Sequence, residues 1–290
     1  MAAEIVSWLS CEPGGKYVDC TVGYGGLGVE IVTRSEPGGV FVGIDQDAEA
    51  VRAALEQLRG RRCEIHVIKG NFRELQGHVH GLGIAKVNGI VFDLGVSSPQ
   101  IDQPERGFSF SASGPLDMRM DQSATLCATD LVNGLSEGEL ADLIYRYGEE
   151  RYSRRIARAI IHARQASPLR TTRDLVSVVE QAVPFMYRRG KIHCATRTFQ
   201  ALRIAVNQEL DVLEPAIRQA ADLLIPGGRM CVLSFHSLED RIVKHTLRAL
   251  SKRPEATLSV LTKKPQVPSK EECRRNPRAR SAKLRVAERL

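Results

Sequence analysis

The stretch that decides the fold reads Tyr17-Val18-Asp19-Cys20-Thr21-Val22-Gly23-Tyr24-Gly25-Gly26-Leu27-Gly28. An apolar strand ends here in a glycine-rich turn, and a helical segment and a second apolar strand, residues 40–45, follow it. Because glycine accepts positive φ angles and lets the backbone approach a ligand closely, this order predicts a βαβ unit for a nucleoside-containing cofactor. Asp45 closes the second strand, where a carboxylate can accept hydrogen bonds from both ribose hydroxyls.

The turn itself is compatible with more than one cofactor. Residues 23–28 satisfy the pattern G-x-G-x-x-G, which fits a nicotinamide or flavin dinucleotide site and equally an S-adenosylmethionine site. A tight turn without a ligand is the remaining interpretation. The rest of the chain has to decide between them.

The composition is that of a globular protein with an excess of positive charge. The chain has 290 residues, of which 43% are hydrophobic and 26% charged, so it can bury one large core or two modest ones. Its formal net charge of +7 and isoelectric point near 9.1 favour a polyanionic partner, since lysines and arginines that neutralise phosphates release counterions. A merely basic protein without such a partner is the alternative.

The cysteines and the N-terminal segment bear on the compartment. Seven cysteines form no C-x-x-C pair, so we expect neither a metal site nor a disulfide framework, and a reducing environment. The first 15 residues lack a secretory signal, and no apolar run approaches the roughly 20 residues of a membrane span. We therefore expect a cytoplasmic protein without membrane contact, with a mitochondrial or plastid matrix as the alternative.

Two further strands extend the pattern to a sheet. Residues 64–69 and 87–93 are apolar, and helical segments separate the strands. The alternation predicts an α/β fold with a mostly parallel sheet, whose ligands bind outside the carboxyl ends of the strands. Phe72 and Asp93 follow these strands, so they should lie on the same edge as Asp45. The Phe72 ring either lies along an adenine face or packs in the core.

A long polar loop and a block of helices come after Asp93. The loop extends to Asp121, and segments of this length inside compact domains are usually functional, although a solvated linker is the alternative. A capping box, Ser136-x-x-Glu139, opens a helix, and residues 172–182 form another. We predict a helical insertion for substrate recognition at 108–192, inside a discontinuous domain made of 1–107 and 193–290.

Three polar or basic patterns are candidates for substrate contact. A first set of arginines is spaced by three and four residues, which gathers them on one surface that contacts phosphates or is simply solvated. Residues 195–224 predict one long helix with a polar line that faces either a substrate or solvent. Residues 276–285 form either a basic phosphate-binding arm or a disordered tail. The arginines are Arg151, Arg154, Arg155 and Arg158, and the polar line is Thr196, Gln200, Arg203 and Asn207.

The order of these features is that of a class I methyltransferase sheet. Methyl transfer from a sulfonium depends on alignment of the nucleophile, the methyl carbon and the sulfur more than on acid or base catalysis. Asp93, Ser97 and Ser98 follow the fourth strand, where their oxygens suit an exocyclic amine whose N–H groups need partners. These three are the candidate catalytic residues.

Six segments resemble the bacterial 16S ribosomal RNA cytosine-N4 methyltransferases and their organellar relatives. The segments are residues 93–100, 104–109, 114–121, 196–207, 234–244 and 276–285, and the resemblance covers nearly the whole chain. It implies a Rossmann-like, S-adenosylmethionine-dependent methyltransferase fold with an inserted helical domain. It also implies a cytosine in the decoding centre of small-subunit ribosomal RNA as the acceptor, and that RNA or the assembling small subunit as the partner. A homodimer is left open.

The resemblance also assigns residues to the site. By the family pattern, the cofactor-binding residues are Gly25, Gly26, Leu27, Asp45, Phe72, Asp93 and Gln100. The candidate substrate-binding residues in the matching segments are Arg106, Arg119, Arg203, Asn207 and His236.

Two departures from the family pattern affect the cofactor end of the site. The chain has Leu27-Gly28 where the family usually has His followed by Ser or Thr, and it starts without the usual His-x-Pro-Val segment. A catalytically impaired member that acts as a ribosome-assembly factor is therefore one alternative. A nicotinamide-dependent oxidoreductase is another, although no hydride-transfer group is recognisable near the predicted edge.

Overall fold

The computed structural model describes residues 1–252 and 254–290 and divides them into two compact units. Met1–Gly95 and Leu210–Leu290 form the sheet unit, and Val96–Glu209 form the helical unit. The helical unit thus includes residues 96–107 and 193–209 in addition to the predicted 108–192. The additional residues belong to it because Asn207 bonds to the backbone of the loop at Met118 and Met120, and Leu116 bonds to Arg170.

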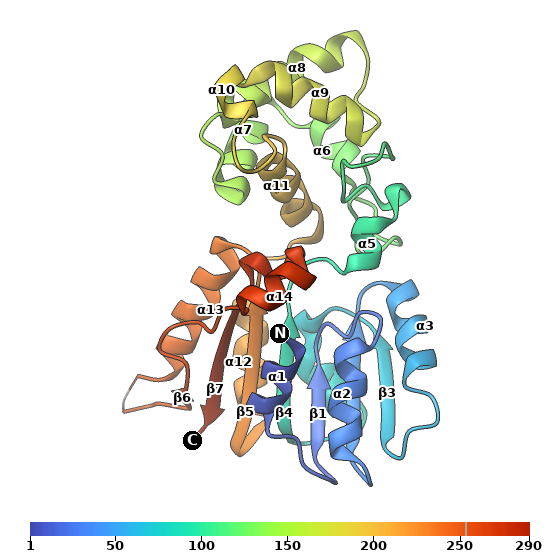
Figure 1. The fold of residues 1–290 in the computed structure, drawn as a ribbon, viewed down its shortest axis with the longest axis vertical. Coiled ribbons are helices and arrows are strands. Elements are labelled where there is room, and N and C mark those ends of the chain that lie inside the picture. Colours follow the sequence, from blue (N-terminus) through green and yellow to red (C-terminus); the bar gives the residue numbers. More distant parts are fainter. Residues whose placement is uncertain (253) are drawn as a thin grey trace. The chain divides into compact units, whose positions relative to one another are not determined.

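The sheet unit contains a seven-stranded sheet in the order β3-β2-β1-β4-β5-β7-β6 (Figure 1). The first five of these strands run parallel, and β7 pairs antiparallel with both β5 and β6. This confirms the predicted α/β fold. The strands are β1 (Lys16–Asp19), β2 (Val40–Asp45), β3 (Glu64–Lys69), β4 (Val87–Asp93), β5 (Leu224–Ser234), β6 (Leu258–Val260) and β7 (Lys283–Arg289).

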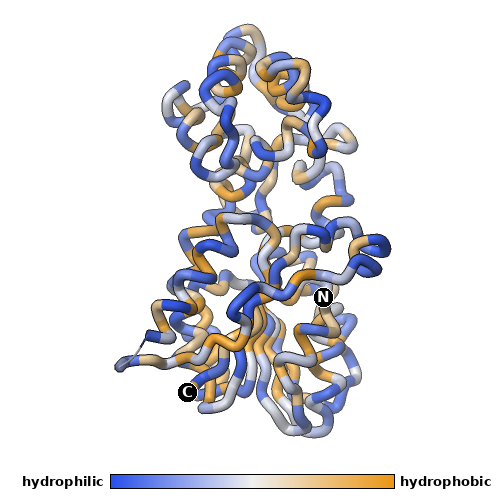
Figure 2. Tube along the Cα trace, turned by 60° about the vertical axis from the view of Figure 1, so that its left-hand side comes forward, coloured by the Kyte–Doolittle hydropathy of each residue, from blue (hydrophilic) through white to orange (hydrophobic). Residues whose placement is uncertain are grey.

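Helices cover both faces of the sheet because successive strand residues point to opposite sides. Val18 and Val42 belong to one buried cluster, with residues of α4, α12 and α13, whereas their neighbours Tyr17 and Phe41 belong to another, with residues of α1, α2 and α3. Hydrophobic residues accordingly line the strands in Figure 2. The helices are α1 (Ala2–Leu9), α2 (Gly26–Ser35), α3 (Ala48–Gln57), α4 (Leu75–Gly81), α12 (Leu213–Leu223), α13 (Ser237–Leu250) and α14 (Lys270–Arg275), with the 3-10 turns η1 (Phe72–Glu74) and η3 (Pro277–Ser281).

The basic C-terminal segment is part of the sheet. The disordered-tail alternative for residues 276–285 is wrong, because η3 leads directly into β7, which lies between β5 and β6. Phosphate binding by this segment stays a prediction, and Arg278 and Arg280 of η3 are exposed. Leu284 and Val286 of β7 are fully buried. Arg285 is also buried, and its guanidinium bonds to the Asp240 carboxylate at 2.7 Å. The alternation of apolar and basic residues thus marks a strand with one face in the core.

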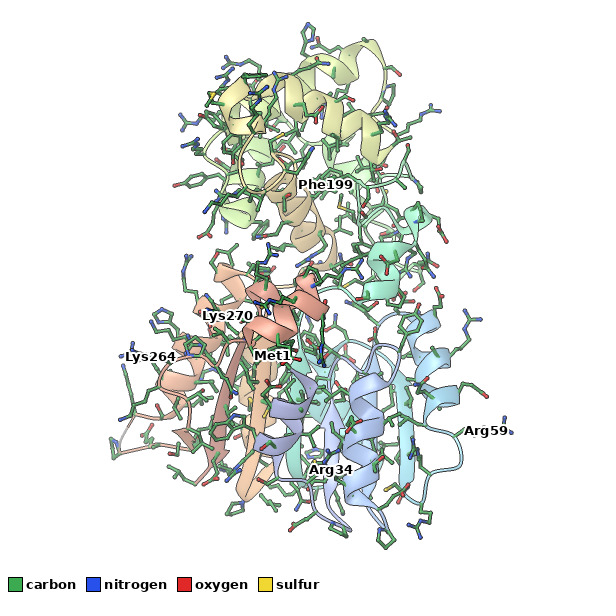
Figure 3. The ribbon with its side chains drawn as sticks, viewed as in Figure 1. Met1, Arg34, Arg59, Phe199, Lys264 and Lys270 are labelled. Atoms are coloured by element: carbon green, nitrogen blue, oxygen red, sulfur yellow. The ribbon has the colours of Figure 1, made fainter. Side chains whose placement is uncertain are left out.

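The helical unit has its own core. Phe199 points inward from α11 and packs against Phe110, with the ring centroids 4.9 Å apart (Figure 3). The predicted capping box at Ser136 and the helix 172–182 are confirmed. The elements are α5 (Ser98–Asp102), η2 (Pro104–Arg106), α6 (Ala128–Gly134), α7 (Glu137–Gly148), α8 (Ser153–Ala166), α9 (Thr172–Ala182), α10 (Phe185–Arg188) and α11 (Thr196–Asn207).

The single helix predicted for residues 195–224 is two helices. α11 stops at Gln208, whose φ of 51° is left-handed, and α12 starts at Leu213. The apolar side chains of the two helices belong to different cores, so one uninterrupted stripe would not serve both. Among the described residues, no helix is long and apolar enough to cross a membrane.

Candidate functional site

The glycine turn after β1 leaves the start of α2 open. Gly23 and Gly25 have φ angles of 51° and 86°, and a Cβ at Gly25 would lie 3.1 Å from the Ala54 Cα. Gly25 is the N-cap of α2, and no side chain caps the helix. A Cβ at Gly26 would have no described atom within 4 Å. The first amides of a helix lack intrahelical acceptors, so this end of α2 favours a carboxylate or phosphate group.

Asp45 fixes the turn from the end of β2. Its Oδ2 accepts a hydrogen bond from the Gly23 amide, and its Oδ1 accepts one from the Asp47 amide, both at 2.9 Å. Burial raises the pKa of this carboxyl above its ordinary value. Each carboxylate oxygen has a second lone pair, so Asp45 can still accept hydrogen bonds from two hydroxyls of a ligand.

Phe72 lies beside the same edge. It starts η1 after β3, and the Gly70 amide ties this loop to the Asp45 carbonyl at 2.9 Å. The Phe72 ring meets Phe92 edge-on, with centroids 5.7 Å apart, and remains partly exposed. The core interpretation of Phe72 therefore holds in part, because the ring packs against Phe92. The contact with an adenine stays a prediction, for which the ring keeps an accessible surface.

Asp93 ends β4 with an unsatisfied oxygen. Its Oδ1 is buried and accepts no hydrogen bond from any residue that the structure describes. Burial raises the pKa of Asp93 to about 6. A buried acceptor without a donor is costly, so the atom is suited to receive an N–H or O–H from a bound molecule.

Two residues at the end of β1 belong to this edge and were not singled out from the sequence. The Thr21 hydroxyl accepts a hydrogen bond from the Asp93 amide at 2.6 Å and lies 3.4 Å from Asp19 Oδ1. Asp19 is only 1% exposed, and burial raises its pKa to about 7, with the Asp93 and Asp45 charges adding to the shift. The signal available in the sequence was its position, since Asp19 ends a strand as Asp45 and Asp93 do.

The departure at Leu27-Gly28 has a packing reason. A Cβ at Gly28 would lie 2.9 Å from the Phe41 Cζ, so the Ser or Thr of the resembled family would require the buried Phe41 ring to shift. Leu27 packs against the apolar cluster beneath α2.

In the helical unit, the residues after Asp93 form a capped turn of helix. The Ser97 hydroxyl accepts from the Gln100 amide at 3.4 Å, and the Gln100 Oε1 accepts from the Ser97 amide at 2.9 Å. Ser98 is the first residue of α5. Gln100 is buried, and its Oε1 holds the start of α5.

The loop after α5 is ordered by three of the predicted substrate-binding side chains. Arg106, 2% exposed, donates to the carbonyls of Arg119 and Met120 at 3.1 and 3.0 Å. Arg119 makes two bonds to the Asp117 carboxylate, and these outweigh the effect of burial and lower the Asp117 pKa. Asn207 accepts from the Met120 amide at 2.8 Å. The linker alternative for this loop is excluded by its internal bonding.

The last two predicted substrate-binding residues also have internal partners. Arg203 forms a two-bond ion pair with Glu209, each bond 2.8 Å long. In the sheet unit, His236 is the N-cap of α13, and its Nδ1 accepts a hydrogen bond from the Glu239 amide at 3.4 Å. Its buried Nε2 lies 3.2 Å from the Glu239 carboxylate but forms no hydrogen bond with any residue that the structure describes. The structure gives all five of these residues a role in holding loops and helix ends.

The strand order and the residues on this edge define the class of the protein. A parallel sheet with an antiparallel β7, a glycine turn after β1 and acids after β1, β2 and β4 are the features of an S-adenosylmethionine-dependent methyltransferase of Rossmann-like fold. A crystal structure of a candidate rRNA methylase from Clostridium thermocellum shares the fold, with a TM-score of 0.50 at 12% identity over 100% of this chain and 95% of that one.

The chain belongs to the MraW methylase family, whose model matches residues 1–290. It is 47% identical to the Ribosomal RNA small subunit methyltransferase H of Brevibacillus brevis, over 99% of this chain and 96% of that protein. The protein of the same name from Halothermothrix orenii is 45% identical over the same shares of the two chains. The cofactor is accordingly S-adenosylmethionine, and the oxidoreductase alternative is excluded.

Proposed function

We propose that the protein transfers a methyl group from S-adenosylmethionine to the N4 amine of a cytosine in the decoding centre of small-subunit ribosomal RNA. Relatives of 45–47% identity carry the name of a small-subunit ribosomal RNA methyltransferase, which supports the RNA substrate. The choice of the cytosine amine rests on the resemblance of residues 93–100 and on the unsatisfied Asp93 Oδ1.

The site residues fit this cofactor in a specific arrangement. The open amides at the start of α2, from Gly26 onward, suit the methionine carboxylate. Asp45 would accept from the ribose hydroxyls, and Phe72 would lie against the adenine. Leu27 would contact the cofactor through its backbone, and Gln100 is the last of the predicted cofactor-binding residues.

The reaction requires alignment more than proton transfer. When bound, the cofactor supplies a methyl group on a sulfonium sulfur, a good leaving group. Asp93 with its free lone pairs would accept an amine N–H and so direct the nitrogen lone pair away from itself. Ser97 and Ser98 are the proposed additional partners of the base. After the methyl transfer, the amine nitrogen loses a proton to water or to a carboxylate.

Transfer of radiolabelled methyl to small-subunit RNA tests the proposal. Asp45→Ala and Asp93→Ala are expected to abolish incorporation, while Glu56→Ala, an exposed acid on α3 of the same unit, leaves it unchanged. Free RNA and assembled subunits should be compared as acceptors. Nuclease digestion would then identify the modified base; methylation of another base or of a ribose would contradict the N4 assignment.

One observation favours a second candidate, an assembly factor without methyl transfer. Leu27 replaces the imidazole that the resembled family places at the cofactor. Tight binding of the RNA together with absent methyl transfer in the unmodified chain would support this candidate. The partner in both cases is the ribosomal RNA or the small subunit, and we propose a cytoplasmic location.

A further inference from the structure

The helical unit carries an aromatic and basic surface at the junction of α8 and α10. The rings of Tyr152 and Tyr187 meet with centroids 4.9 Å apart at an angle of 70°. The Arg151 guanidinium lies over both rings, 4.8 and 4.9 Å from their centroids. Arg189 lies 4.4 Å over the ring of Phe185. These five residues form a surface that we call the tyrosine–arginine platform.

A buried acid holds the platform in place. Glu150 is fully buried and accepts a hydrogen bond from the Tyr187 hydroxyl at 2.5 Å and from the Tyr152 amide at 2.8 Å. Burial, with the adjacent Glu150, raises the Tyr187 pKa to about 12, so the hydroxyl remains a donor at neutral pH. The start of α8 and the short α10 are therefore linked by a short, partly buried hydrogen bond.

The outer part of the platform is apolar and exposed. Phe185 is 58% exposed and the adjacent Met186 is 76% exposed, although both lie in a segment whose other aromatic residue, Tyr187, is bonded inward. An exposed aromatic ring under a guanidinium is poorly explained by folding alone, because it buries little surface. A flat π surface next to a cation is the arrangement that accepts a stacked base.

Positive charge surrounds this surface. Arg154, Arg155 and Arg158 are exposed on α8, and of these Arg158 pairs with Glu137 at 3.3 Å. Arg155 also lies 5.9 Å from the Tyr152 ring centroid. Arg188, the last residue of α10, and Lys191, which follows the helix, are also exposed. Cations next to exposed rings complement a phosphate backbone with unpaired bases.

We propose that the tyrosine–arginine platform binds single-stranded RNA, stacking an unpaired base on Phe185 and pairing phosphates with the surrounding arginines. The inference rests on the proposed function for the identity of the substrate, and adds where a segment of that RNA other than the target base is held. A duplex would offer phosphates without accessible base faces, and an acidic protein would offer charge without bases.

Fluorescence anisotropy with the full chain tests the platform. The probes are labelled single-stranded oligocytidine of about ten nucleotides, the abasic oligonucleotide of equal length, and a duplex. Phe185→Ala should weaken binding of the single strand by roughly tenfold and leave the abasic binding nearly unchanged, whereas Phe185→Tyr keeps the affinity. Val267→Ala, an equally exposed apolar residue of the sheet unit, is the matched control.

The charge contribution is measured separately. Arg151→Gln should reduce the slope of log affinity against log salt by about 0.7, the value for one phosphate contact on a single strand. Arg59→Gln, on the exposed outer side of the sheet unit (Figure 3), should leave the slope unchanged.

Three outcomes would overturn the inference. They are an unchanged affinity in Phe185→Ala, an equal loss for the single-stranded and abasic probes, and a change in sedimentation of Phe185→Ala that reveals a protein interface. A failure of the proposed function is distinguishable, because it abolishes methyl transfer in the unmodified chain while the anisotropy results stand. If methyl transfer is normal and Phe185→Ala binds RNA as the unmodified chain does, the platform proposal is rejected and the proposed function is not.

Discussion

The Asp93 amide donates a 2.6 Å hydrogen bond to the Thr21 hydroxyl, which joins the ends of β4 and β1. The two strands are neighbours at the centre of the sheet, where the strand order changes direction. Ligands of open α/β sheets bind outside such a position. The bond therefore sets the position of the Asp93 carboxyl relative to the glycine turn.

Replacing Thr21 should weaken both the fold and cofactor binding. Thr21→Val keeps the shape but leaves the Asp93 amide without its acceptor, which costs about 1–3 kcal/mol of unfolding free energy. Thr21→Ser keeps the hydroxyl and should behave nearly as the unmodified chain. Urea denaturation and calorimetric titration with S-adenosylmethionine measure the two effects. Equal cofactor affinity in Thr21→Val and Thr21→Ser would show that the hydroxyl has no positioning role.

Two adjacent glycines should respond differently to alanine. Gly25→Ala places a Cβ at positive φ and 3.1 Å from the Ala54 Cα, so we expect a loss of stability of about 1–3 kcal/mol. Gly26→Ala has open space and a helical conformation, so the thermal midpoint should stay constant or rise slightly. Its methyl group nevertheless occupies the approach to the start of α2, and affinity for S-adenosylmethionine should fall. Unchanged affinity would mean that the cofactor does not approach Gly26.

The cofactor-free chain should gain stability on mild acidification. The folded pKa values of Asp19 and Asp93, about 7 and 6, lie above the ordinary value of 3.8, so the folded chain binds more protons between pH 4 and 7. Stability consequently falls as the pH rises through this window, by at most about 1.4 kcal/mol per pH unit for each carboxyl, and it is lowest above pH 7.

Asp19→Asn isolates this effect. The variant should be more stable than the unmodified chain at pH 8, with a smaller difference at pH 5, measured by urea denaturation. Carboxyl groups whose pKa is lowered by folding do not interfere. In Asp240, for example, the ion pairs with Arg285 and Lys283 outweigh burial and lower the pKa, so the contribution of this carboxyl to stability changes only at lower pH. Parallel stability curves for the two proteins between pH 5 and 8 would contradict the predicted protonation.

We expect Arg106 to stabilise the helical unit. Arg106→Lys keeps the charge but not the planar group that donates to the carbonyls of Arg119 and Met120, so we expect a loss of about 2–4 kcal/mol. The salt dependence of RNA binding by the folded variant should match the unmodified chain. A reduced salt slope with normal stability would restore the direct phosphate contact that the sequence suggested.

The sequence by itself determined the sheet and its ligand edge. The strands at 64–69 and 87–93 have the predicted ends, because short apolar runs between turn signals leave little freedom in a parallel sheet. Asp45, Phe72 and Asp93 meet at one edge for the same topological reason, since parallel strands align their carboxyl ends. Local patterns and connection rules suffice for such statements.

Only the tertiary structure decided what the polar and basic residues do. The alternation of residues 283–289 is that of a strand, but its partners β5 and β6 come from distant parts of the chain. Arg106 and Asn207 were predicted as substrate contacts, whereas their bonds are internal. A charged side chain has the same sequence signature whether its partner is a phosphate or a carbonyl far along the chain. Hydrogen bonds and burial between residues distant in sequence therefore assign these roles, and no local pattern encodes them.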